Sequence, residues 1–189
     1  IDSALGELEN ICESHESYRS PRRTMVEIYL LRGDFELALE ALAPLLEADK
    51  LNYWALRYAG DACLHSGDLA GAWEYFGRAV RRFSGDPTLH YARGEIALVA
   101  GDRKRGRAEL MWALDARPAF IPARVRLAQD YFDAGDFERA YWHAEAVLEL
   151  APGHEQAEEI LDASVDGNRA EMRGDLTLDR RSFGIGDNV

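Results

Sequence analysis

Three carboxylates recur at one fixed interval along the chain, and their spacing gives them the clearest capacity to bind an ion. Glu27, Asp61 and Glu95 follow one another at intervals of 34 residues. Arg23 and Arg57 stand four residues before the first two acids, whereas a tyrosine stands four residues before Glu95. Acid–base pairs at this spacing stabilise a helix by about 0.2–0.5 kcal/mol. The acids therefore either pair within their own helices or present negative charge to a cationic partner.

Histidines and cysteines do not follow the spacing of a catalytic or metal centre. The sequence lacks the HExxH pattern, the GxSxG nucleophile motif and the glycine-rich loops that bind nucleotides. The histidines are spread along the chain at His15, His65, His90, His143 and His154. Cys12 and Cys63 form no CxxC motif, which favours two reduced thiols. We therefore expect no enzymatic activity, no bound metal and no cofactor.

A repeated glycine–aspartate pair indicates which elements must position these residues. It occurs at Gly33-Asp34, Gly67-Asp68, Gly101-Asp102 and Gly135-Asp136, again at intervals of 34 residues. Glycine can adopt the left-handed conformation that ends a helix. Aspartate can then accept a hydrogen bond from a free backbone N–H at the start of the next helix. Each period therefore predicts a first helix, a turn and a second helix.

Small and apolar residues recur in register with these turns and predict how the helices pack. Small residues five positions after each turn glycine are Ala38, Ala72, Gly106 and Ala140. Seven positions before it stand Val26, Gly60, Gly94 and Ala128. Pro44 should kink its helix, and Gly106 should lower helix propensity by up to ~1 kcal/mol. Pro118 and Pro152 should close their second helices, and Pro87 should do so late.

This pattern resembles the tetratricopeptide repeat family, which has paired helices, a 34-residue period and small residues at two fixed places. The resemblance covers four repeats, at 19–52, 53–86, 87–120 and 121–154. It implies an all-α solenoid, a right-handed superhelix of antiparallel helix pairs whose first helices line a concave groove. Residues 1–18 then correspond to the second helix of a truncated N-terminal repeat. Residues 155–175 are predicted as a C-terminal capping helix region, followed by a flexible tail or linker at 176–189.

The resemblance also implies which residues face a ligand. These partner-binding groove residues are Arg23, Glu27, Trp54, Arg57, Tyr58, Asp61, His65, Tyr91, Glu95, Arg126, Gln129, Phe132 and Asp133. Some family members clamp a C-terminal carboxylate with basic and asparagine side chains. Position 27 is glutamate here, and later basic positions hold Thr88 and Ala92, so that function is not expected. The acids instead predict a partner that carries lysine or arginine.

A second charged cluster opens the second helix of the third repeat, at Arg103, Lys104, Arg105 and Arg107. Cations at a helix N-terminus oppose the helix dipole. The cluster is therefore either a possible anion patch or a solvated edge of the loop. We state both readings as hypotheses.

Composition restricts the partners and the compartment. The net charge is −12, with 47% hydrophobic and 30% charged residues. The sequence has no basic stripe of the kind that binds nucleic acid, so we expect no nucleic-acid partner. No apolar run is long enough to cross a bilayer, so we expect no membrane span. Arginine far exceeds lysine, which favours a bacterial source, and the cysteine usage favours a cytoplasmic location. The chain begins at Ile1, so something was removed or it is part of a longer protein.

These observations favour a protein–protein interaction scaffold or adaptor that binds an extended peptide or a helix. One alternative is a regulatory or targeting module of a larger enzyme. Another is a homo-oligomer that assembles through the terminal part-repeats.

Overall fold

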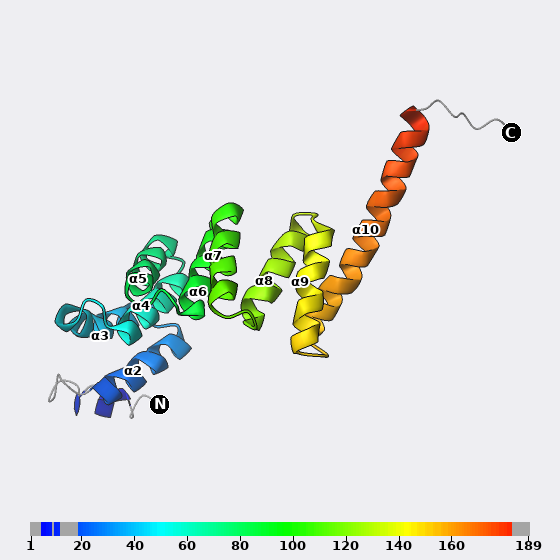
Figure 1. The fold of residues 1–189 in the computed structure, drawn as a ribbon. Coiled ribbons are helices and arrows are strands. Elements are labelled where there is room, and N and C mark those ends of the chain that lie inside the picture. The colour runs from blue at the N-terminus through cyan, green and yellow to red at the C-terminus, as the bar shows by residue number, and fades with distance from the viewer. Residues whose placement is uncertain (1–4, 9, 12–18, 183–189) are drawn as a thin grey trace. The chain divides into compact units, whose positions relative to one another are not determined.

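The computed structural model describes residues 5–8, 10–11 and 19–182, and the side chains of residues 5–8, 10–11 and 21–169. Within these ranges the chain is helical and contains no strand (Figure 1). The helices are α2 (Arg19–Arg32), α3 (Phe35–Ala48), α4 (Tyr53–Ser66), α5 (Leu69–Arg82), α6 (Pro87–Val99), α7 (Arg103–Ala116), α8 (Ile121–Asp133), α9 (Phe137–Leu150) and α10 (Glu155–Ser182). The predicted all-α fold of paired helices is confirmed. Cys12 and His15 lie outside the described residues.

The turns between paired helices follow from the glycine–aspartate chemistry, with one exception. The four turn glycines have φ values between 77° and 85°, in the left-handed region. The side chains of Asp68, Asp102 and Asp136 each accept a hydrogen bond from the backbone N–H three residues later. At Asp34 the predicted cap is wrong, since the side chain makes no capping hydrogen bond. Its carboxylate lies 2.9 Å from Arg32 Nε instead.

The chain forms two compact units, Ile1–Glu109 and Leu110–Val189. The first unit has a core in which Val26, Ala38 and Leu42 are fully buried, and a neighbouring cluster is built around Phe76 and Leu89. The second unit packs α8, α9 and α10 around Ala128, Ala140 and other small residues. Small side chains at these positions let neighbouring helices approach closely.

Two glycines show how tight this packing is. A Cβ atom on Gly60 would lie 2.6 Å from the Phe76 ring, and one on Gly106 would lie 2.5 Å from Leu98 Cγ. Gly106 stands where the other three repeats have alanine, and Leu98 occupies the space that a methyl group would need there. The predicted loss of helix propensity is thus accompanied by a closer contact between α6 and α7.

Proline positions differ from the sequence prediction in one place. Pro87 does not close α5, which ends at Arg82, but opens α6. A proline is well placed there because its missing N–H needs no partner in the first turn. Pro44 is exposed, and α3 continues past it to Ala48.

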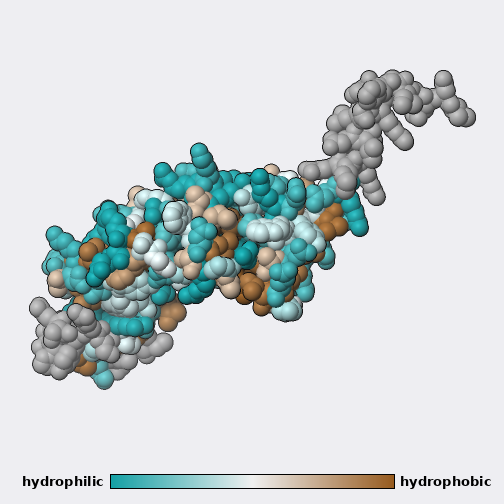
Figure 2. Space-filling model, in the orientation of Figure 1, coloured by the Kyte–Doolittle hydropathy of each residue, from teal (hydrophilic) through white to brown (hydrophobic). Residues whose placement is uncertain are grey.

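α10 extends beyond the predicted capping region. It continues to Ser182 and so includes residues 176–182, which the sequence assigned to a tail or linker. In the described part of the chain, no helix combines the length and apolarity needed to cross a membrane. The face drawn in Figure 2 is mostly hydrophilic, with hydrophobic residues gathered in separate brown areas.

Candidate functional site

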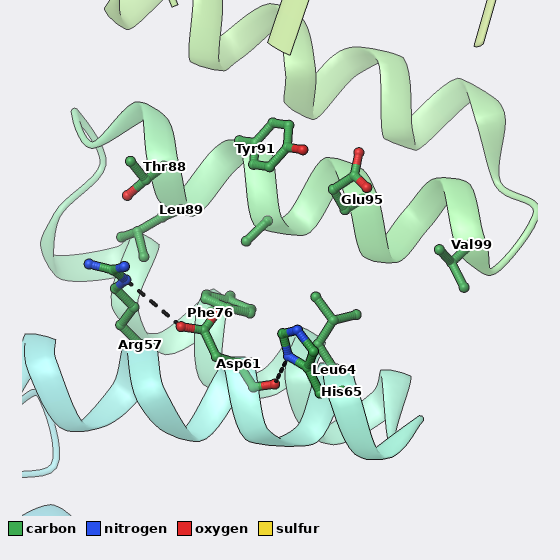
Figure 3. Close-up of a pocket in the computed structure, with 11 residues that line it drawn as sticks. Arg57, Asp61, Leu64, His65, Phe76, Thr88, Leu89, Tyr91, Glu95 and Val99 are labelled. Carbon is green, nitrogen blue, oxygen red and sulfur yellow. Dashed lines mark hydrogen bonds and ion pairs between the residues drawn. The ribbon is translucent and has the colours of Figure 1, made fainter. Parts of the chain in front are cut away.

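A cavity of 470 Å³ lies between α4 and α6 in the first unit (Figure 3). We call it the α4–α6 pocket. Its lining consists of Arg57, Asp61, Leu64, His65, Phe76, Thr88, Leu89, Tyr91, Ala92, Glu95 and Val99. The two helices are first helices of successive repeats, so equivalent positions on them come to face one space. The pocket is therefore a product of the 34-residue period.

Two carboxylates from different helices line this pocket, Asp61 on α4 and Glu95 on α6 (Figure 3). Arg57 Nε lies 3.9 Å from Asp61 Oδ2, which is too long for a hydrogen bond. Burial raises the pKa of Asp61, and the nearby Arg57 and His65 only partly oppose that effect. Asp61 is thus a carboxylate that a further cation would stabilise in its charged form.

One end of the pocket is apolar. Leu64 and Val99 line this end, and the close-up shows Leu64 beside His65 on α4 and Val99 at the end of α6, whereas Phe76 lies nearer Asp61 (Figure 3). Val99 is 63% exposed, which is a high exposure for an aliphatic side chain in a pocket wall. His65 Nδ1 donates to the Asp61 carbonyl oxygen over 2.8 Å. This hydrogen bond orients the ring at the boundary between the charged and apolar ends.

The start of α6 is fixed by a hydrogen-bonded group that also places Thr88 in the pocket. Tyr53 donates to Asp86, the N-cap residue of α6. The backbone N–H and the hydroxyl of Thr88 both donate to Asp86 Oδ1, over 2.8 and 2.7 Å. These contacts tie the loop before α6 to α4. They hold the two walls of the pocket in register.

Glu27, the first of the three acids spaced 34 residues apart, has a different role. Its Oε1 accepts hydrogen bonds from Tyr58 over 2.6 Å and from Arg23 over 2.9 Å. The Tyr58 hydroxyl, followed by Arg23, lowers the pKa of Glu27. Trp54 packs against Tyr58 with ring centroids 4.9 Å apart. These four residues form a contact between α2 and α4 and do not line the pocket.

The remaining predicted groove residues belong to the second unit. Gln129 Nε2 donates to Asp133 Oδ1 over 2.8 Å. Phe132 packs edge-on against Phe137, with centroids 5.6 Å apart. Arg126 is half-buried on α8. Contacts within α8 and across the turn to α9 therefore engage Gln129, Asp133 and Phe132 locally.

Side chains around Trp73 partly engage the predicted anion patch. Arg105 Nε lies 3.7 Å from Asp102 Oδ2, and the guanidinium groups of Arg105 and Arg93 lie 5.2 and 4.1 Å from the centre of the Trp73 ring. Arg93 also forms a 2.9 Å ion pair with Glu109. The other patch residues are Arg103 and Lys104, which are exposed, and Arg107, which is half-buried. Asp102 already supplies negative charge at the start of α7.

Sequence reasoning missed the apolar half of the pocket. Val99 stands 34 residues after His65 and so occupies the same repeat position. That register was a usable signal, but a search for polar and aromatic residues passes over a valine. Leu64 and Phe76 were hidden among ordinary core positions. Among the residues that the structure describes, no group of three or more histidine, cysteine or acidic side chains could hold a metal ion.

Comparison with known proteins confirms the fold. The tetratricopeptide repeat family model matches residues 24–87. No curated protein matches the sequence significantly. The predicted resemblance to tetratricopeptide repeat proteins is thereby confirmed.

Solved structures of such proteins are similar over most of the chain. MamA (residues 41 to the end) from Desulfovibrio magneticus RS-1 is 20% identical with a TM-score of 0.71, over 82% of this chain and 87% of that one. TTC0263 from Thermus thermophilus is 20% identical with a TM-score of 0.69, over 87% and 90% of the two chains. YrrB, described as a repeat protein with an unusual peptide-binding site, is 21% identical with a TM-score of 0.64, over 87% and 94%. At these identities the likeness defines the fold.

Proposed function

We propose that this chain is a protein-interaction module that binds a segment of a partner protein at the α4–α6 pocket. The observation that carries the proposal is the meeting of Asp61 and Glu95, from two successive repeats, in one 470 Å³ cavity. Ligand sites commonly combine an apolar wall with a few convergent polar groups, as this cavity does. The description of YrrB as peptide-binding supports the same use of the fold.

The partner segment carries a basic side chain. Carboxylates on neighbouring helices about 10 Å apart repel by roughly 0.4 kcal/mol in water and by more where water is excluded. A lysine or arginine from a partner relieves this repulsion and also opposes the desolvation that raises the pKa of Asp61. Among the described residues, Arg57 is the one arginine or lysine that lines the pocket, and its side chain is 48% exposed. The guanidinium can therefore swing aside when a ligand cation approaches Asp61.

The test is binding of fluorescein-labelled, blocked peptides that differ only in one central residue: arginine, lysine, glutamate or alanine. We expect the basic peptides to bind and the others to bind at least tenfold more weakly. Asp61→Asn and Glu95→Ala should each lower the affinity for the basic peptides and reduce its salt dependence. Glu40→Gln, at an exposed acid of α3 outside the pocket, is the matched control. Unchanged affinity and salt dependence in both pocket variants would refute the proposal.

A further inference from the structure

The α4–α6 pocket changes character along its length. Arg57 and Thr88 lie toward the N-terminal ends of its helices, Asp61 and Glu95 lie nearer the middle, and Leu64 and Val99 lie toward the C-terminal ends (Figure 3). A basic side chain between Asp61 and Glu95 satisfies only the charged part. The apolar part remains in contact with water, with Val99 63% exposed. The pocket therefore has room and chemistry for a second side chain.

The spacing of the two parts indicates how the ligand is built. Glu95 and Val99 are four residues apart on α6, which corresponds to about 6 Å along a helix axis. In an extended chain, residues i and i+2 point to the same side and lie about 6.4–6.8 Å apart. Adjacent residues of an extended chain point to opposite sides. A basic and an aliphatic residue separated by one position thus match the two parts of the pocket.

We propose that the pocket recognises a basic residue and an aliphatic residue, separated by one position, on an extended segment of a partner protein. This proposal rests on the proposed function and specifies its ligand. The base lies between Asp61 and Glu95, and the aliphatic side chain covers Leu64 and Val99. His65, held by the Asp61 carbonyl oxygen, separates the two side chains.

Three blocked, fluorescein-labelled alanine-rich peptides test the proposal by fluorescence anisotropy: one with Arg-Ala-Leu, one with Arg-Ala-Ser and one with adjacent Arg-Leu. We expect the first to bind about fivefold more tightly than either of the others, because only it buries a leucine in the apolar part. Val99→Ser should abolish this preference. Leu31→Ser should preserve it, since Leu31 occupies the same repeat position, is 88% exposed and lies outside the pocket.

The outcomes separate the two proposals. Equal binding of the three peptides, with weaker binding to Asp61→Asn, would overturn the paired motif and leave the basic-peptide site in place. A preference for Arg-Ala-Leu that survives Val99→Ser would also overturn it. Failure of every basic peptide to bind the unmodified chain would overturn both proposals. Circular dichroism of both serine variants checks that their helices are intact.

Discussion

At the scale of single residues, a missing methyl group sets the distance between α4 and α5. Gly60 is buried, and an added Cβ would lie 2.6, 2.7 and 2.9 Å from three ring atoms of Phe76. Phe76 is only 1% exposed. We expect Gly60→Ala to destabilise the fold by about 1–3 kcal/mol through overpacking, as measured by urea unfolding followed by circular dichroism.

Gly77 is the matched control for this prediction. It also lies within a helix, α5, but an added Cβ there would meet no atom within 4 Å. Gly77→Ala should therefore raise stability by about 0.5–1 kcal/mol, since alanine loses less conformational freedom than glycine in a helix. If Gly60→Ala were as stable as Gly77→Ala, the close approach of α4 and α5 would be wrong.

His143 gives the second unit a dependence on pH. It is 3% exposed and stacks on Tyr131, with ring centroids 5.5 Å apart. Burial, assisted by Arg124, lowers its pKa from 6.5 to about 4. As the pH falls below 6.5, the unfolded chain gains a proton at this position while the folded chain does not. Stability should fall until about pH 4 and then level off, by on the order of 1–3 kcal/mol in total.

His143→Phe isolates this contribution because it keeps an aromatic ring and removes the titration. We expect the difference in unfolding free energy between His143→Phe and the unmodified chain to move in favour of the variant as the pH falls from 7 to 4. Other titrating groups are common to both proteins and cancel in the difference. Parallel pH profiles would show that His143 binds protons equally in the folded and unfolded states.

At the scale of helices, two aspartates in the same repeat position provide a test of capping. Asp68 accepts a hydrogen bond from the Gly71 N–H at the start of α5, over 2.9 Å, whereas Asp34 makes no such bond at the start of α3. Asp68→Ala should cost about 1 kcal/mol of stability. Asp34→Ala should cost less, because it removes only a partly exposed ion pair with Arg32. Equal losses in urea unfolding would contradict the difference between the two turns.

The same pair of residues shows which features of a helix are readable from sequence. Glycine and aspartate determine where one helix ends and the next begins, so their spacing predicted the paired helices. The partner chosen by Asp34 depends on Arg32, whose reach across the turn no repeat pattern encodes. Gly106 is a similar case, because the lack of space for a side chain there comes from Leu98 on a neighbouring helix. Local chemistry was predictable, and contacts between helices were not.

At the scale of the whole molecule, the repeat register predicted which residues share one side of each first helix. It did not predict the contacts that these residues make. Asp61 and Glu95 occupy equivalent positions and line one pocket. Glu27 occupies the same position in the first repeat, yet Tyr58 and Arg23 engage its carboxylate. The position equivalent to Tyr58 in the next repeat is Ala92, and Tyr91 stands one residue before it. The hydrogen bond between Tyr58 and Glu27 therefore has no exact counterpart in the next repeat. Departures from exact repetition therefore decide which acids line the pocket.

The net charge of −12 will attract any basic peptide, so affinity alone does not identify the pocket. The general field acts mainly on the rate of association, and salt weakens it. A contact within the site acts mainly on the rate of dissociation.

Asp61→Asn and Glu40→Gln change the net charge equally, but only Asp61 lines the pocket. Stopped-flow fluorescence should therefore show dissociation of an arginine peptide about tenfold faster from Asp61→Asn, equivalent to about 1.4 kcal/mol. Glu40→Gln should leave dissociation unchanged and slow association by less than about twofold. Equal effects of the two variants would mean that the charge of the molecule, and not the pocket, holds the peptide.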